Sequence, residues 1–572
     1  MQRTIPIENT AQGYLELLRD RGVKYFFGNA GTDFASLIDA FVKFSQEGKS
    51  EPHPITVPHE FVGVSMAHGY YMISGEPQVV MVHVIVGTAN AAAAIMNAAR
   101  ANVPIIFTAG RTPFTEAGVM GSRDVSIHWA QESFDQGSLI REFVKWDYEL
   151  KHFSQLESVV DRALAIAMAE PRGPVYLSLP REVLAEAHSE ITITTGGRQQ
   201  SGGMLHPDPA QVEEVAELFA RAEHPLIITG AVGRDPEAVE ALVAFSESFA
   251  IPVVMGMNNL YMNFPTSHPL HLGFDPAPLL READVMLVID SDVPWFPTVV
   301  RPKDTARVIQ LRSDPLYNRY PLRGYPTDIA LAANPAAALR LLTQEIMRYH
   351  GKAKRRINRR FETLRKEHEC QRQAWREEGQ AVKYDKPIDP IWLSACTNQV
   401  KDEETILINE YDLVPTQVDL EVPGSFFRSS PASGLGWGVG AGLGAKLAAP
   451  EKTIIAAVGD GSYLFSGPTA CHFVSRAYAL PILVIIFNNQ CWNAVRGATR
   501  ALHPQGWAVK ANRFPLSDLS PPPAYEMICE ANGGYGERVE DPEEVLPALQ
   551  RALRVVREEG RQAVLNVICK RP

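Results

Sequence analysis

The sequence predicts an α/β protein of three doubly wound parallel-sheet domains. Short runs of apolar, β-branched residues recur along the whole chain, helical stretches separate them, and two shifts in composition interrupt the series. Apolar runs without alternation indicate strands that are covered on both faces, which is typical of parallel sheets. Function is then expected at the carboxyl ends of the strands.

The expected strands follow one another in three groups. Those of the first domain, 1–190, are ITV (55–57), QVVMVHVIV (78–86), VPIIFTAG (103–110) and PVYLSLP (174–180). Those of the central domain, 204–345, are PLIITG (225–230), IPVVMG (251–256), DVMLVID (284–290) and ARVIQL (306–311). Those of the last domain, 385–572, are TILINE (405–410), TIIAAV (453–458) and PILVIIF (481–487).

Two segments are predicted to link these domains. The polar, Gly-rich stretch ITITTGGRQQSGG (191–203) offers nothing from which a core is built. The segment 346–384 is dense in charges of both signs and is predicted to be a solvated helical linker.

Composition excludes several classes of protein. The 572 residues are 45% hydrophobic and 21% charged, the balance of a soluble globular chain. A formal net charge of −11 gives no electrostatic footprint for nucleic acid. The start of the chain lacks the apolar region of a secretion signal, the apolar runs are too short to cross a bilayer, and the six cysteines show no paired spacing. We therefore expect a cytoplasmic protein that binds neither nucleic acid nor membranes.

The segment 452–493 carries the most chemistry. A buried strand ends in GDGS (459–462), a helix follows, and a second buried strand ends in Asn488-Asn489. If these strands are neighbours, Asp460 and Asn489 emerge side by side as oxygen ligands for Mg²⁺, which usually completes its shell with phosphates and water. The glycines allow close backbone approach, and N–H groups at a helix start suit a phosphate. The pattern predicts a diphosphate site.

The first and last domains share a layout. The stretches 87–110 and 467–489 each contain a Gly-led helix rich in small residues, then Pro, then a buried strand that ends in a polar turn. Two copies of one α/β fold facing each other across a ligand would produce this repeat.

The GDG and NN elements together resemble the thiamine-diphosphate signature of the acetolactate synthase/benzoylformate decarboxylase superfamily, and the resemblance covers nearly the whole chain. It implies a pyrimidine-binding domain (1–190), a central domain (204–345) and a diphosphate-binding domain (385–572). It implies Mg²⁺ ligands at Asp460, Asn489 and the main-chain carbonyl of Cys491. The implied cofactor contacts are Gly459, Gly461, Ser462, Asn488 and Leu435, the last matching the apolar residue that keeps thiamine bent.

The resemblance also assigns Glu60, which follows the strand at 55–57, to the pyrimidine ring nitrogen of the cofactor. In this superfamily that glutamate and the metal site come from different subunits. The implied assembly is a homodimer at minimum, and we expect a homotetramer.

On the substrate side, FFGNAGTDF (26–34) and the stretch 82–110 look most like benzoylformate decarboxylase. His83 then matches a histidine that moves protons, and Thr32 stands where that enzyme has a carboxylate-binding serine, so both join Glu60 in the predicted catalytic set. Taken alone, a histidine inside an apolar strand is more often a hydrogen-bonded core residue. The expected substrate-pocket residues are His128, Gln131, Trp492 and Asn493.

Two departures from the family pattern qualify this assignment. A second histidine of benzoylformate decarboxylase has no counterpart in 290–300, which leaves the proton relay incomplete. Val495 stands where pyruvate decarboxylases have a glutamate, which disfavours that activity.

The resemblance implies a 2-oxo acid decarboxylase or carboligase that acts through ylid and enamine intermediates on a small 2-oxo acid and a carbonyl acceptor. An acetolactate synthase-like enzyme that condenses pyruvate is the alternative; it would add FAD as a structural cofactor, which no glycine fingerprint in the central domain supports. The run GWGVGA (436–441) keeps an NAD(P)-dependent oxidoreductase as a distant alternative. A non-catalytic relative is disfavoured because Glu60, Asp460 and Asn489 are all present.

Overall fold

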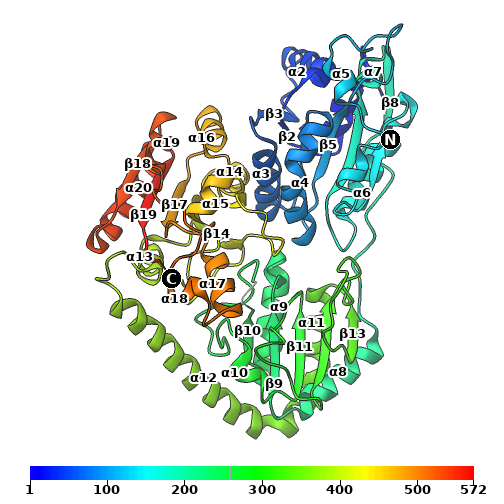
Figure 1. Cartoon of the computed structure of the whole chain (residues 1–572). Coiled ribbons are helices and arrows are strands. Elements are labelled where there is room, and N and C mark those ends of the chain that lie inside the picture. Colours follow the sequence, from blue (N-terminus) through cyan, green and yellow to red (C-terminus); the bar gives the residue numbers. More distant parts are fainter. Residues whose placement is uncertain (257–258, 572) are drawn as a thin grey trace.

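The structure is a computed structural model that describes residues 1–256 and 259–571. Residues 257–258 of the predicted central domain and residue 572 lie outside the described residues. Over the described ranges the chain forms three parallel sheets and one two-stranded antiparallel sheet, which confirms the predicted fold class. In Figure 1 the N-terminal domain lies at the upper right, the C-terminal domain at the left and the central domain below them.

The N-terminal sheet has the strand order β3-β2-β4-β5-β7-β6. Its strands are β2 (Tyr25–Gly28), β3 (His53–Thr56), β4 (Val79–Val82), β5 (Ile106–Arg111), β6 (Asp147–Glu149) and β7 (Val175–Pro180). Its helices are α1 (Thr10–Asp20), α2 (Ala35–Gln46), α3 (Glu60–Ser74), α4 (Val84–Arg100), α5 (Ile127–Ala130), α6 (Leu156–Met168) and α7 (Arg181–Ala185), with 3₁₀ turns η1 (Thr32–Phe34), η2 (Gly137–Leu139) and η3 (Phe153–Gln155).

The central sheet has the order β10-β9-β11-β12-β13. Its strands are β9 (Pro225–Thr229), β10 (Val253–Met255), β11 (Val285–Ile289), β12 (Arg307–Arg312) and β13 (Ile329–Ala332). Around it lie α8 (Pro209–Arg221), η4 (Val232–Arg234), α9 (Pro236–Phe249), α10 (Ala277–Leu280), α11 (Pro335–Ile346) and η5 (Met347–Tyr349). The charged segment that follows forms α12 (His350–Ala381), which runs along the lower left of Figure 1 toward the C-terminal domain.

The C-terminal sheet has the order β15-β14-β16-β17-β19-β18. Its strands are β14 (Thr405–Glu410), β15 (Phe426–Arg428), β16 (Thr453–Gly459), β17 (Leu483–Asn488), β18 (Tyr535–Val539) and β19 (Ala563–Ile568). Its helices are α13 (Pro390–Val400), α14 (Trp437–Ala448), α15 (Asp460–Phe465), α16 (Pro468–Ala477), α17 (Asn493–Leu502), α18 (Trp507–Lys510), α19 (Tyr525–Ala531) and α20 (Val545–Glu558), with η6 (Pro415–Gln417) and η7 (Pro542–Glu544).

The N-terminal and C-terminal sheets have the same topology. Taken in chain order, the six strands of each sheet occupy the same positions, with the first strand between the second and the third. This agrees with the shared layout expected from the sequence. In such a sheet the loops after the first and third strands meet where the winding direction reverses, and ligands bind at that point.

Two sequence expectations are corrected by the structure. The strand predicted at 78–86 ends at Val82, and His83 is the N-cap of α4 rather than a residue inside a strand. Hydrophobicity hid this boundary because the apolar run continues from the strand into a largely buried helix. Part of the linker predicted at 191–203 forms β8 (Glu190–Thr194), which pairs with β1 (Gln2–Pro6), because its alternating Ile and Thr give one buried face.

The N-terminal and C-terminal domains are joined by a close crossing of α3 and α14, which lie side by side in Figure 1. A Cβ on Gly69 would come within 2.1 Å of the Ala441 carbonyl oxygen, and one on Gly444 within 1.9 Å of the Met66 carbonyl oxygen. Glycine is therefore required on both helices, since any side chain would push the two backbones apart. The crossing fixes the start of α3, where Glu60 lies, relative to the glycine run before α14.

Among the described residues, no helix combines the length and the apolar character needed to cross a bilayer.

We predict that Gly444→Ala destabilises the protein by about 1–3 kcal/mol, because the added methyl group meets backbone rather than a movable side chain. Gly442→Ala, in the same helix, is the matched control: its Cβ would meet the flexible tip of Ile482 at 3.0 Å. Urea unfolding should show a lower midpoint for Gly444→Ala and an unchanged or higher midpoint for the control, because alanine favours the helix. Equal stability of both variants would show that α3 and α14 can move apart at this crossing without destabilising the protein.

Candidate active site

Three loops of the N-terminal domain meet at the carboxyl edge of its sheet. β2 lies between β3 and β4, and Gly28 pairs with Met81. The loop after β2 carries Thr32 and Asp33, the residue after β4 is His83, and the loop after β3 leads to Glu60, the first residue of α3. The fold therefore brings the three predicted catalytic residues to one edge.

The contacts within this group are direct. The imidazole Nδ1 of His83 lies 2.5 Å from Oδ1 of Asp33, whose side chain is 2% exposed. The Thr32 hydroxyl lies 3.3 Å from Nε2 of His128 on α5. Glu60 accepts a hydrogen bond from Nδ2 of Asn90 at 2.5 Å. Asp33 and Asn90 were not expected as site residues, although they lie within the stretches 26–34 and 82–110 that carry the resemblance.

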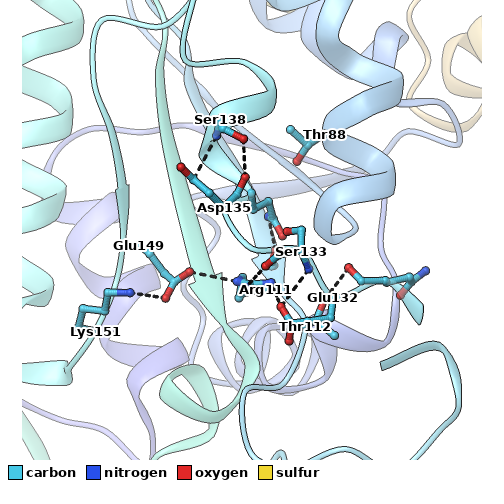
Figure 2. Close-up of polar contacts among 12 residues, drawn as sticks. Thr88, Arg111, Thr112, Glu132, Ser133, Asp135, Ser138, Glu149 and Lys151 are labelled. Atoms are coloured by element: carbon cyan, nitrogen blue, oxygen red, sulfur yellow. Dashed lines mark hydrogen bonds and ion pairs between the residues drawn. The ribbon is translucent and has the colours of Figure 1, made fainter. Parts of the chain in front are cut away.

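A polar network holds the segment that carries His128 and Gln131. Arg111, at the end of β5, donates to Glu149 at 3.1 Å and to the Ser133 carbonyl at 2.8 Å, as Figure 2 shows. It also forms an ion pair with Glu132. The Thr112 hydroxyl donates to the Gln131 carbonyl at 3.2 Å. These bonds fix the loop beside the cluster, so both expected pocket residues lie near His83.

The two histidines of the cluster differ in their titration. The hydrogen bond and charge of Asp33 raise the pKa of His83 above its ordinary value, although burial opposes them, and Glu60 adds in the same direction. Burial lowers the pKa of His128, and the charge of Arg181 acts with it. His83 is therefore the better proton donor near neutral pH, whereas His128 is a neutral hydrogen-bonding group.

The second group lies at the carboxyl edge of the C-terminal sheet. β16 and β17 are neighbours with Gly459 opposite Phe487, so Asp460 emerges beside Asn488 and Asn489, as the sequence predicted. Burial raises the pKa of Asp460 to about 6, opposed by hydrogen bonds from the N–H groups of Gly461 and Gln490. Its Oδ2 is buried and has no hydrogen-bond partner within residues 1–256 and 259–571.

The turn after β17 presents further oxygens. Asn489 Oδ1 accepts from the Cys491 N–H at 3.0 Å, and Asn488 donates to Asn566 at 2.9 Å. The Oδ1 of Asn488 is buried and has no hydrogen-bond partner in the part of the chain that the structure describes. Cys491 pairs with Asp518 in an isolated bridge whose hydrogen bonds use the Gln490 carbonyl and the Trp492 N–H. The Cys491 carbonyl thus takes no part in the hydrogen bonds of this bridge.

The other predicted cofactor contacts lie around the same turn. Gly459 and Gly461 leave no room for a side chain: a Cβ would meet Asp412 Oδ2 at 2.5 Å and the Trp492 ring at 2.1 Å, respectively. Ser462 is buried within α15. Trp492 therefore packs on the GDG turn, and Asn493 begins α17 beside it.

Leu435 lies in the glycine run that precedes α14. Gly434 on one side exchanges two hydrogen bonds with the Asn97 side chain of α4, at 2.8 and 3.0 Å. Gly436 on the other side has a φ of 98°, which favours glycine. The backbone on both sides of Leu435 is thus held in place.

Two carboxylates that the sequence did not single out join this site. Glu410, at the end of β14, accepts from the N–H groups of Gly436 and Gly438 at 2.8 and 2.6 Å and caps α14, while burial raises its pKa to about 7. Burial, together with the charges of Asp460 and Glu410, raises the pKa of Asp412 to about 7. The only sequence signal was their position at the end of a buried strand.

This chemistry fits a divalent cation held together with a diphosphate. Asp460 and Glu410 raise the pKa of the buried Asp412, and Oδ2 of Asp460 is buried with no hydrogen-bond partner among the described residues, so a cation would be stabilising here. No group of three or more His, Cys, Asp or Glu side chains in the described part of the chain is arranged to hold a metal by itself. A cation here would need further oxygens, as Mg²⁺ usually takes from phosphates and water.

Comparison with known proteins agrees with this arrangement. Three family profiles match in order: "Thiamine pyrophosphate enzyme, N-terminal TPP binding domain" at residues 8–139, the central domain of the same family at 212–342, and its C-terminal TPP binding domain at 413–567.

Among similar proteins, benzoylformate decarboxylase of Pseudomonas aeruginosa is 27% identical over 84% of this chain and 86% of its own length. The acetolactate synthase large subunit of Mycobacterium tuberculosis is 25% identical over 90% of this chain and 88% of its own. The solved 4-hydroxybenzoylformate decarboxylase of Rhodococcus jostii has the same fold, with a TM-score of 0.79 at 22% identity over 99% of both chains.

Proposed function

The chain belongs to the thiamine pyrophosphate enzyme family, and from this premise we propose that it decarboxylates a small 2-oxo acid and either releases the aldehyde or joins it to a carbonyl acceptor. The observation that carries this proposal is the pair of polar clusters at equivalent edges of two sheets with the same topology. One presents buried oxygens suited to a cation and diphosphate, and the other presents a carboxylate beside a histidine.

Thiamine diphosphate, when bound, supplies the electron sink that accepts the bonding electrons as CO₂ leaves. We assign Asp460, Asn489 and the Cys491 carbonyl to Mg²⁺. Gly459, Gly461, Ser462 and Asn488 would contact the diphosphate, and Leu435 would support the bent cofactor.

In the other cluster, Glu60 would hold a proton at the pyrimidine nitrogen, and His83 would give and take the proton at the reacting carbon. Thr32 and His128 would bind the substrate carboxylate. His128 supplies the second histidine that is missing from 290–300, from the N-terminal rather than the central domain.

Specific observations bear on the two alternative functions, an NAD(P)-dependent oxidoreductase and an acetolactate synthase-like enzyme. The first N–H groups of the GWGVGA run (436–441) are taken by Glu410, which disfavours a dinucleotide diphosphate there. An acetolactate synthase-like activity remains the alternative because such enzymes are among the relatives. FAD would then need a site such as the cavity of about 690 Å³ at the ends of β9, β11 and β12.

We propose a homodimer at minimum, and a homotetramer as the fuller assembly. Hydrogen bonds and ion pairs of Glu60, His83 and Asp460 stay within their own clusters among the described residues. The segment beside the first cluster exposes the apolar side chains Phe114, Val119, Met120, Ile127, Trp129 and Phe134. A second copy that covers them would bring its own Asp460 cluster toward Glu60. We also propose a cytoplasmic location, since all six cysteines are free.

Demetallated protein should bind thiamine diphosphate with measurable heat only when Mg²⁺ is supplied with it, and the loaded protein should release CO₂ from at least one of pyruvate, benzoylformate or a branched 2-oxo acid. Calorimetry and a coupled CO₂ assay measure the two steps. A flavin band in the visible spectrum of the purified protein, together with acetolactate formed from pyruvate, would favour the alternative. No heat and no CO₂ would reject the function.

Glu60→Gln should lower turnover by about 10²-fold or more while cofactor binding persists, because the variant keeps the side chain's shape but loses its proton chemistry. Asp460→Ala should instead lose the cofactor, since it removes a charged cation ligand. Calorimetry and turnover together separate the two losses. Glu76→Gln and Asp385→Ala, at exposed ion pairs, are the controls and should retain both properties.

Mixing the two inactive variants tests whether subunits share a site. After unfolding and refolding together, Glu60→Gln and Asp460→Ala chains should recover about a quarter of wild-type activity, because half of the dimers are mixed and each of these has one intact site. Either variant refolded alone should stay inactive. If the subunits are shown to exchange and the mixture still recovers no activity, Glu60 and Asp460 of one site belong to the same chain.

A further inference from the structure

Asp33 is a buried carboxylate that no motif or family assignment uses. It is 3% exposed and lies in η1, in the loop that follows β2, and β2 is a neighbour of β4 in the sheet. Its Oδ1 contacts His83 Nδ1 at 2.5 Å, and its Oδ2 accepts from the Val84 N–H at 3.4 Å. One carboxylate therefore binds both the imidazole and the first N–H group of α4.

Two glycines make room for this pair. A Cβ on Gly31 would lie 2.1 Å from His83 Nδ1, and a Cβ on Gly110 would lie 1.7 Å from Asp33 Oδ2. At each glycine the three nearest atoms all belong to His83 or to Asp33, respectively. The space left by the missing side chains of the two glycines is therefore occupied by His83 and Asp33.

The backbone beside the pair is also held in an uncommon conformation. Val84 has a φ of 35°, a left-handed value that β-branched residues rarely adopt. Such strain persists only where the surroundings enforce it, and it tends to occur at functional sites. Here it turns the chain directly after His83, so that the imidazole leaves the strand end toward Asp33.

We propose that Asp33 is a positioning residue for His83: its carboxylate fixes the ring through Nδ1 and leaves Nε2 as the nitrogen that exchanges the proton with the substrate. The pairing stands on the geometry alone, whereas its effect on turnover rests on the proposed function. Because parallel neighbours β2 and β4 end at the same edge, the contact follows directly from the strand order.

The proton balance is simple. His83, as the imidazolium, gives its Nε2 proton to the carbon that has lost CO₂, and the N–H bonding electrons return to the ring. In the resulting neutral imidazole the remaining proton stays on Nδ1 and is donated in a hydrogen bond to Asp33. This hydrogen bond fixes the tautomer. Water returns the Nε2 proton before the next turnover.

The other groups that face His83 come from two elements. Glu60, at the start of α3, is negatively charged like Asp33 and also raises the pKa of His83. His128, on α5, is positively charged when it is protonated and then repels the imidazolium of His83. Gln131, the residue after α5, is neutral, and its side chain acts to raise the pKa of His83. Asp33 is the partner in direct contact, and removing its charge should therefore have the largest effect.

Asp33→Asn is predicted to lower the pKa of His83 by about one unit, because the imidazolium loses its directly bonded counter-charge. NMR titration of histidine-labelled protein, with and without thiamine diphosphate and Mg²⁺, measures this; His83→Gln identifies the signal. The pH above which turnover declines should fall by the same amount, and kcat should fall more than KM rises. Asp39→Asn, at an exposed residue of α2, should change none of these values.

Gly110→Ala gives a second test that leaves Asp33 in the sequence. Its methyl group occupies the place of Oδ2, so the carboxylate must move and the pKa of His83 should fall as in Asp33→Asn. Gly63→Ala, whose Cβ meets neighbours only at 3.6 Å or more, is the matched control.

An unchanged His83 titration in either folded variant overturns the proposal. A shifted titration in wild-type-like folds supports it even if none of the 2-oxo acids is a substrate, because the NMR measurement needs no turnover. Failure of the wild-type enzyme in every turnover assay would reject the proposed function and leave the titration result standing.

Discussion

The backbone contact between α3 and α14 is the constraint on which the arrangement of the site depends. Each helix begins at or close to a residue assigned to the cofactor: α3 starts with Glu60, and α14 starts two residues after Leu435. Carbonyl oxygens lie about 2 Å from where a Cβ of Gly69 or Gly444 would stand, so a side chain at either position would force the two helices apart. Asn97 adds polar bonds from α4 to Gly434, so the glycine run is held from two helices.

The shared strand order of the terminal domains explains why each has one polar cluster. In both sheets the first and third strands are neighbours, so the loops that follow them meet at the carboxyl edge. In the N-terminal domain these loops supply Asp33 and His83; in the C-terminal domain they supply Asp412 and Asp460. Equivalent positions of one topology thus carry different chemistry, which a repeat in the sequence alone would not disclose.

The sequence predicted the fold class, because buried parallel strands are continuous apolar runs, and it predicted that Asp460 and Asn489 emerge at adjacent strand ends. It missed Asp33, Glu410 and Asp412 because their partners are set by strand order, and hydrophobic periodicity does not report strand order. It also placed His83 inside a strand, since the apolar run continues past the turn at Val84. Asp33 and Glu410 bond to backbone N–H groups at a helix start, and Asp412 lies against Gly459 at the end of the neighbouring strand.

The two clusters solve the same electrostatic problem in different ways. A buried carboxylate is costly unless a counter-charge lies nearby. In the N-terminal cluster the chain supplies that charge itself, since Asp33 bonds an imidazole whose pKa it raises. In the C-terminal cluster burial raises the pKa of Glu410, Asp412 and Asp460, and the charges of Asp460 and Glu410 raise that of Asp412 further. Arg428 and Arg571 offset only part of this. The first cluster therefore carries its own counter-charge and is suited to moving protons, whereas a cation from outside would best stabilise the second. Under the proposed function, cofactor binding would then depend on the metal.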